Sequence, residues 1–519
     1  MGINKMRTKI LALCISAALS FNTVGLTVNP ANAQAGQVNI TITNPYKNVD
    51  WASFGQYKAA HHTHSTFSDG SNTRRDMLID KYNKGFDIVA MTDHDTTTGA
   101  WYAAPSEDSW NNNWNGIGTA TLSMAETWNI NNGTYDASNF PGTYTGRRQQ
   151  NNGMIGMGFS NEISANGGFS PGVYGGHHMN AFFAYVPGNV GSIGRTMAEV
   201  IQYVQDAGGI THINHPGRYT GAQNNADLSR DPVNVNRYAQ LFMDFPSLVG
   251  VEIINKWDGE SVNDRILWDN ILMQTAPQGR LVWGFSNDDS HSLSGNGHAW
   301  NVMLMPSFDE AAVKTSMETG AFYGVSRIDR HHGINHLLGG WTPGAPQQTT
   351  TTDTQYTGGV HNNFALGMLD EPAPSITKIV TSGNAISVYG EDFHTVVWIA
   401  DGAIISAGNT IDLSGLSGYS YVRAELVGYY GVAYTQPFGI EVEESRLVSM
   451  SAASSSTNLQ NNTTVTITVT GRYDDGSTAI LASAPVRLKQ NGTQSVKVGD
   501  YDVTVVVNGN NKITSITVK

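Results

Sequence analysis

Cysteine is almost missing from this sequence. Its 519 residues include one, Cys14. Cys14 lies in an N-terminal segment that we expect to be removed, so the mature chain is predicted to have neither disulfides nor a cysteine nucleophile.

Charge is also scarce, at 14% of residues, and acidic side chains outnumber basic ones by 43 to 30, for a net charge of −13. A surface of this kind does not attract polyanions, so nucleic acid is not expected as a partner of the general surface.

Long apolar runs are few, and the one at residues 10–19 has the features of a signal peptide. It follows Lys5, Arg7 and Lys9, and Ala31-Asn32-Ala33 offers small residues for cleavage after Ala33. A transmembrane anchor needs about 20 unbroken apolar residues, and polar residues interrupt this run. We therefore expect residues 1–33 to be cleaved and the protein to be secreted or held at the cell surface.

Several segments between residues 73 and 325 repeat one plan, in which an amphipathic helix, a stop, a short apolar strand and polar residues follow one another. Helices are expected at 73–84, 196–207, 263–275 and 309–319. This alternation predicts an α/β fold with a largely parallel sheet, and polar residues at the carboxyl ends of strands are typical of barrel active sites. The periodicity alone leaves open whether the sheet closes.

Other segments depart from this plan. Residues 101–153, rich in Trp, Asn and Gly, form an insertion, either a substrate lid or binding rim or a solvated excursion. Short alternating strands follow residue 371. The predicted organisation is a signal peptide (1–33), a catalytic barrel domain (34–345), a linker (346–370), a β-sandwich (371–443) and an immunoglobulin-like domain (444–519).

Histidines and carboxylates gather where the strands of the first domain are expected to end. In "HHTHSTFSDGS" the alternation of a strand points His62 and His64 to one face, and Asp289 with His291 repeats this spacing. The complete candidate set is His62, His64, Asp69, His94, Glu162, His178, His215, Asp289 and His291. Nine such side chains exceed what one four-coordinate zinc ion can use, so two or three metal ions are predicted.

The ordered series His62-x-His64, Ser68-Asp69-Gly70, Thr92-Asp93-His94, Glu162, His178, His215-Pro216 and Asp289-x-His291 resembles the PHP (polymerase and histidinol phosphatase) metallohydrolase family over roughly residues 55–330. The resemblance implies a distorted (β/α)7 TIM-like barrel and a cluster of zinc, manganese or iron.

Carried over by position, the resemblance assigns three metal ions. The first would be held by His62, His64, Glu162 and Asp289, the second by Glu162, His178 and His215, and the third by Asp69, His94 and His291. His61, His177 and His212 match no position and are expected to pack or to support ligands, and His298 is an open candidate.

The C-terminal strands are similar to β modules of secreted members of the family and to bacterial immunoglobulin-like spacers. We therefore hypothesise association with the cell wall through these domains.

The leading hypothesis is a secreted metal-dependent phosphoesterase. Its cations would activate water to hydroxide for attack on a phosphomonoester or diester, in a small molecule or a surface polymer. Asp289, His291 and Arg218 are assigned to catalysis, with Arg218 of "HPGR" contacting a phosphoryl oxygen. Two alternatives stay open at this stage: a carboxylic ester or carbamate hydrolase on the same metal site, and a non-catalytic cell-surface binding protein.

Overall fold

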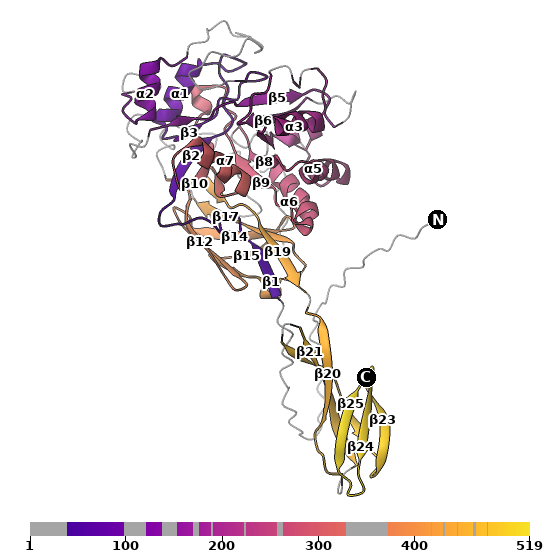
Figure 1. Cartoon of the computed structure of the whole chain (residues 1–519). Helices are drawn as coiled ribbons and strands as arrows, with labels where there is room; N and C mark the ends of the chain where they lie inside the picture. The colour runs from indigo at the N-terminus through magenta and orange to yellow at the C-terminus, as the bar shows by residue number, and fades with distance from the viewer. Residues whose placement is uncertain are drawn as a thin grey trace. The chain divides into compact units, whose positions relative to one another are not determined.

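The computed structural model describes residues 39–97, 121–136, 153–327 and 372–519, apart from short gaps at 170–175, 188–189, 192, 223–224, 257–262, 417, 429–430, 444, 460–462 and 475. The chain divides into two compact units, Val38–Glu443 and a smaller one that contains Glu444–Lys519 (Figure 1). The predicted signal peptide and the predicted linker lie outside the described residues.

Ten short strands of the larger unit carry the candidate site. They are β2 (Gly55–Ala60), β3 (Ile88–Val89), β4 (Ile155–Gly156), β5 (Asn161–Ala165), β6 (His177–Phe182), β7 (Ile210–Ile213), β8 (Leu248–Ile254), β9 (Trp283–Ser286), β10 (Ala299–Met305) and β11 (Phe322–Ser326). Strands β5 to β9 form one sheet, and the others belong to a second.

The strand directions are mixed. Strands β2, β3 and β4 pair in parallel, as do β7, β8 and β9. Strand β6 is antiparallel to both β5 and β7, and β10 is antiparallel to both β2 and β11. Two isolated parallel bridges, Thr63 with Ser290 and His94 with Glu162, join the two sheets just beyond the strand ends. A closed seven-stranded barrel stays a prediction.

Seven helices lie in the described part of the larger unit: α1 (Arg74–Asn83), α2 (Met124–Asn131), α3 (Met197–Asp206), α4 (Pro216–Thr220), α5 (Pro232–Asp244), α6 (Asp264–Thr275) and α7 (Glu310–Thr319). Helix α1 begins where Thr73 accepts a hydrogen bond from the Asp76 amide, and Thr196 with Glu199 forms a capping box on α3. Helix α3 packs on β7, and α5 and α6 pack on β8 (Figure 1).

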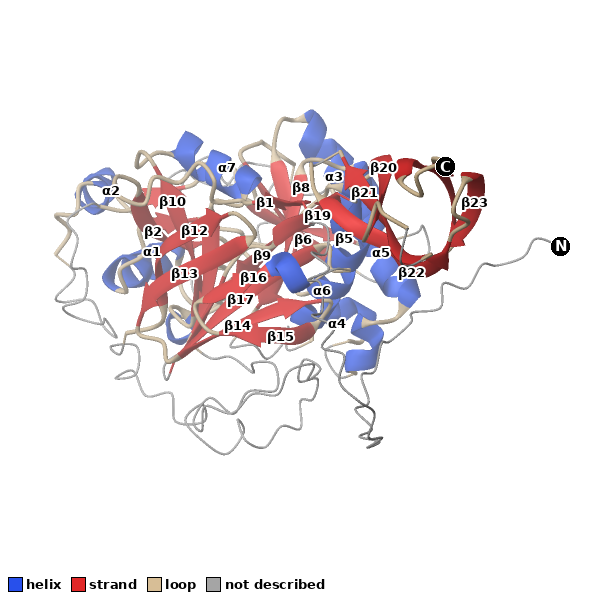
Figure 2. Ribbon diagram, turned by 90° about the horizontal axis from the view of Figure 1, so that it is seen from below, coloured by secondary structure: helices blue, strands red, loops and turns tan. Residues whose placement is uncertain are grey.

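Residues 372–443 do not form a separate domain in this structure, in contrast to the expected boundary at 371. Strand β18 (Gly431–Tyr434) is antiparallel to β11, and β19 (Phe438–Glu443) pairs with β1 (Asn39–Thr43). Strands β14 (Thr395–Ala400), β15 (Ala403–Ala407) and β17 (Tyr421–Gly428) continue the same sheet. A smaller sheet of β12 (Ser375–Ser382), β13 (Ala385–Glu391) and β16 (Thr410–Asp412) lies beside them (Figure 2).

A buried ion pair ties this β region to the helical region. The Arg423 guanidinium donates to both carboxylate oxygens of Asp269 on α6 at 2.8 Å, and it also reaches Glu425 at 2.6 Å. All three side chains are fully buried. Such a pair is satisfied only while both segments stay packed together.

The described residues of the smaller unit form β-strands and no helix. This unit holds two three-stranded antiparallel sheets, β20 (Leu447–Ser454), β21 (Thr464–Tyr473) and β22 (Thr478–Arg487), then β23 (Gly492–Val498), β24 (Tyr501–Val507) and β25 (Ile513–Val518). Alternate residues of β21 and β24 are buried in a shared aliphatic core. This arrangement is that expected of a small sandwich. Within the described residues of the chain, no helix is both long and apolar enough to cross a membrane.

The ion pair gives a test of the single-unit architecture. Asp269→Asn leaves the Arg423 cation buried without its main partner, and we expect the free energy of unfolding to fall by about 3 kcal/mol or more. Glu318→Gln, which breaks the exposed Lys314 pair on α7, should cost no more than about 0.5 kcal/mol. Chemical denaturation measures both, and equal small losses would show that the two regions do not depend on each other.

Candidate metal centre

The nine histidines and carboxylates singled out in the sequence all lie at one place in the structure. They follow or begin strands of both sheets, and the bridges Thr63–Ser290 and His94–Glu162 hold these strand ends together. The His64 amide donates to the Ser290 carbonyl at 2.9 Å, which fixes the segment after β2 against the segment after β9.

A tight turn brings Asp69 back toward His64. The Gly70 amide donates to the Ser65 carbonyl at 3.0 Å. A Cβ atom on Gly70 would lie 2.7 Å from the Ser65 Cα, so a side chain at this position would push the turn open. This contact explains the glycine of the Ser68-Asp69-Gly70 sequence.

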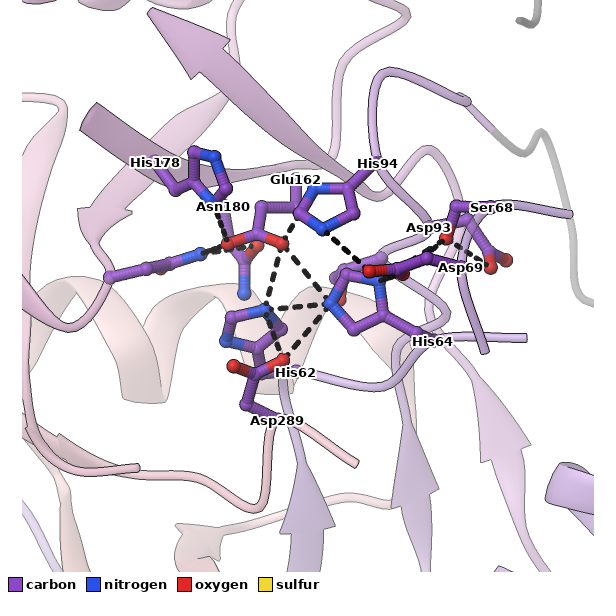
Figure 3. A network of polar contacts seen from close by, with 12 residues as sticks. His62, His64, Ser68, Asp69, Asp93, His94, Glu162, His178, Asn180 and Asp289 are labelled. Carbon is purple, nitrogen blue, oxygen red and sulfur yellow. Dashed lines mark hydrogen bonds and ion pairs between the residues drawn. The ribbon is translucent and has the colours of Figure 1, made fainter. Parts of the chain in front are cut away.

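Glu162 occupies the middle of the cluster (Figure 3). Its Oε2 lies 3.2 Å from His62 Nε2, 3.1 Å from His64 Nε2 and 3.0 Å from His94 Nδ1. Its Oε1 lies 3.0 Å from His178 Nδ1 and 3.3 Å from His215 Nε2. One buried carboxylate therefore faces five imidazoles, as a ligand shared between two ions would.

Asp289 and Asp69 complete the cluster on its two sides. Asp289 Oδ1 lies 3.2 Å from His62 Nε2 and 3.1 Å from His64 Nε2. Asp69 Oδ2 lies 3.5 Å from His94 Nε2 and 3.2 Å from His291 Nε2. Three overlapping groups have donor atoms close enough to share an ion: His62, His64, Glu162 and Asp289; His64, Asp69, His94 and His291; and His94, Glu162 and His178.

The donor atoms fit divalent cations. Glu162 Oε2 and Asp289 Oδ1 are buried, and both lie within 3.2 Å of His62 Nε2 and His64 Nε2. His62 Nδ1 lies 2.7 Å from the Glu252 carboxylate, and His62 Nε2 lies 3.1 Å from His64 Nε2 and 3.2 Å from Glu162 Oε2 and Asp289 Oδ1. A cation satisfies all of these atoms together.

Without a cation, protons take over part of this role. Burial disfavours the imidazolium form of His64, but hydrogen bonds with Asp289 and Glu162 outweigh it and raise the pKa of His64 to about 10. Burial likewise opposes ionisation of Glu162, yet the neighbouring His62 and His94 hold the pKa of Glu162 well below its usual value. His178 differs, because burial lowers its pKa to about 4.

A second layer of side chains orients these groups. The fully buried Glu252 accepts from His62 Nδ1, from the His215 amide at 3.0 Å and from Asn287 at 2.8 Å. Asn214 donates to Glu162 Oε1 at 2.8 Å. Carboxylates and amides in such positions set the tautomer and direction of metal-binding side chains.

Two acidic residues that adjoin candidate ligands form ion pairs with buried basic side chains. Asp93, next to His94, pairs with the buried Arg74 at 2.7 Å. Asp288, next to Asp289, pairs with the buried Lys81 at 2.8 Å and also accepts from the Gly297 and His298 amides. Their charges are thus compensated within the scaffold.

The other histidines lie around the cluster. His61 and His212 are buried against Phe285, and burial lowers their pKa to about 3 and about 4. His177 packs on Phe169, with ring centroids 4.7 Å apart. The His298 ring meets the Ser294 carbonyl at 2.8 Å.

Arg218 lies on α4, one turn after His215. It is exposed, and its guanidinium lies 6.0 Å from the Tyr219 ring, which itself lies 5.6 Å from the His215 ring. Its contact with a phosphoryl oxygen stays a prediction.

Sequence reasoning missed two residues of strand β8 and the segment after it. Glu252 is a lone carboxylate in the otherwise apolar "LVGVEII", and that isolation was the available signal. Lys256 lies two residues beyond β8, with its ammonium 3.2 Å from Asp289 Oδ2.

Similarity to known proteins is confined to solved structures. No family model and no curated protein matches the chain. Among solved structures, a Bacteroides vulgatus two-domain protein containing a predicted PHP-like metal-dependent phosphoesterase is 12% identical, covers 75% of this chain and 96% of its own, and has a TM-score of 0.34.

Two further structures each cover 45% of this chain and 87% of their own at a TM-score of 0.25: a predicted metal-dependent phosphoesterase of Bifidobacterium adolescentis, 17% identical, and a Chromobacterium violaceum amidohydrolase with bound sulfate, 14% identical. With TM-scores this low, assignment of function depends on the site itself.

Metal binding is expected to release protons. Because the pKa of His64 is about 10 in the metal-free cluster, its imidazole is protonated near neutral pH and a metal ion must displace that proton. The affinity for Zn²⁺ or Mn²⁺ should therefore rise as the pH rises toward that value. Titration calorimetry in two buffers of different ionisation enthalpy counts the protons, and a count of zero would contradict this description of the site.

Glu252 provides a test of the orienting layer. Glu252→Gln keeps the shape but loses the charge that holds the Nδ1 proton of His62, so metal affinity should fall by roughly 10- to 100-fold. Glu318→Gln on α7 is the control and should leave affinity unchanged. Metal titration of both variants measures the effect, and an unchanged affinity in Glu252→Gln would exclude the orienting role.

Proposed function

We propose that this protein is a metal-dependent phosphoesterase of the PHP type, with the distorted barrel that this family implies. The observation that carries the proposal is the gathering of nine candidate ligands in one cluster, in which five imidazoles face the buried carboxylate of Glu162. A site of this composition suits two or three ions such as zinc, manganese or iron.

When bound, the cations would lower the pKa of water and polarise phosphoryl oxygens. The chain's own residues would divide the remaining work. Glu162 would hold neighbouring ions at a fixed separation, Asp289 and His291 would place the reacting end of the substrate, and Arg218 would contact a phosphoryl oxygen.

We also propose that the protein acts outside the cell, on a small-molecule or surface-polymer phosphoester, and that the C-terminal unit helps to hold it at the wall. Export is supported by the basic and apolar pattern of residues 1–33, and wall attachment only by the similarity of the last domain to spacer domains.

Hydrolysis of phosphoesters tests the proposal. The metal-loaded protein should hydrolyse a phosphomonoester or diester from a panel, and Asp289→Asn, which removes a charge shared by two imidazoles, should lower kcat by at least about 100-fold. Lys314→Gln on α7 serves as the control and should retain full activity.

Three outcomes would contradict the proposal. Turnover of aryl carboxylic esters well above that of phosphoesters would favour the ester hydrolase. Metal loading without turnover of any substrate would favour a binding protein. Equal activity in Asp289→Asn would place the chemistry elsewhere.

A further inference from the structure

Lys256 contacts a carboxylate of the candidate metal cluster. Its ammonium lies 3.2 Å from Asp289 Oδ2, whereas Asp289 Oδ1 faces His62 and His64. The lysine side chain is 30% exposed, so its ammonium can be reached from solvent, unlike the buried Lys81. Lys256 is therefore a partly exposed cation in contact with a candidate metal ligand.

The surroundings of Lys256 form a cavity beside the cluster. The cavity holds about 270 Å³ and is lined by Lys256, Asp288, Asp289, Ser290, His291, Ser292 and Gly295. Two of these residues, Asp289 and His291, are candidate metal ligands. A molecule in this cavity would touch the metal cluster and the lysine at the same time.

The backbone at Lys256 is held in a conformation that lysine rarely adopts. Its φ is 44°, in the left-handed region, and Asp289 across the cavity has a φ of 45°. Strain of this kind persists where the surrounding structure enforces it, and it concentrates at binding and catalytic sites.

The charge balance gives Lys256 its significance. Four carboxylates, Asp69, Glu162, Glu252 and Asp289, lie in contact with the ligand histidines. Their four negative charges equal the charge of two divalent cations, and Lys256 adds one positive charge beside the cavity. An extra cation in the lining of the cavity favours binding of a ligand with more negative charge.

We propose that Lys256 is a substrate-binding residue that selects dianionic phosphomonoesters over monoanionic diesters. This inference rests on the proposed phosphoesterase function and narrows its substrate class. A terminal phosphate carries close to two negative charges near neutral pH, whereas a diester carries one. The ammonium would form a charged hydrogen bond with the additional oxyanion, a bond that a diester lacks.

Binding of methyl phosphate and dimethyl phosphate to the metal-loaded protein tests this without turnover. Lys256→Gln should weaken methyl phosphate binding by at least about tenfold, the range of a hydrogen bond to a charged group, and dimethyl phosphate binding by less than about threefold. Lys256→Arg keeps the charge and should restore most of the loss. Lys314→Gln is the matched control, because Lys314 is also about one third exposed and also pairs with a carboxylate.

A purely structural lysine would give a different result. If Lys256 only neutralised Asp289, its loss would change metal affinity and leave the ratio of the two phosphate affinities unchanged. Metal content of each variant, measured after loading, shows that the site has folded. Equal losses for both phosphates, or no loss for either, would overturn the proposal.

Kinetics separate this inference from the proposed function. With phosphoester substrates, Lys256→Gln should raise KM for monoesters by about tenfold or more and leave kcat within about threefold. If the protein hydrolyses no phosphoester but still binds methyl phosphate through Lys256, the phosphoesterase proposal fails and the binding site stands. If it hydrolyses diesters in preference to monoesters, the phosphoesterase stands and the selectivity fails.

Discussion

The interaction on which the site depends is the burial of the Glu162 and Asp289 carboxylates among imidazoles. Both are almost fully buried, and each has an oxygen within 3.2 Å of His62 Nε2 and His64 Nε2. Burial of such groups costs several kcal/mol unless opposite charge lies beside them. Protons on histidines supply that charge in the metal-free protein, as the high pKa of His64 indicates. Divalent cations would supply it with better geometry, so metal binding and the stability of this region are linked.

Basic residues of helix α1 neutralise two carboxylates that adjoin the candidate ligands. Asp93 and Asp288 stand directly beside ligand residues, yet Arg74 and Lys81 neutralise them from helix α1. The same helix has Lys84 just beyond its end, and that lysine donates to the Leu293 carbonyl at 2.7 Å. One helix thus holds both the segment after β3 and the segment after β9.

The sequence predicted what depends on local pattern. Helices α1 and α3 follow from their threonine caps. The candidate ligands follow from spacing at strand ends: eight of the nine fall in the groups that could share an ion, and His215 contacts Glu162 beside them. Helix α2 carries a capping box at Ser123 inside the insertion and was overlooked. Pairing of β1 with β19, and of β11 with β18, joins residues more than 100 positions apart, which no local pattern encodes. Glu252 and Lys256 gain their roles only because β8 lies beside β9.

Several residues at the candidate metal centre have a strained backbone conformation. In the described part of residues 39–327, the non-glycine residues in the left-handed region are Asp95, Phe159, Phe183, His215, Lys256 and Asp289. His215 and Asp289 are candidate ligands, Lys256 contacts Asp289, and Asp95 follows His94. Each such conformation costs of order 1–3 kcal/mol. Glycine at Lys256 would relieve that strain but remove the ammonium from the cavity. A lysine in this conformation is better explained by what its ammonium contacts than by the stability of the fold.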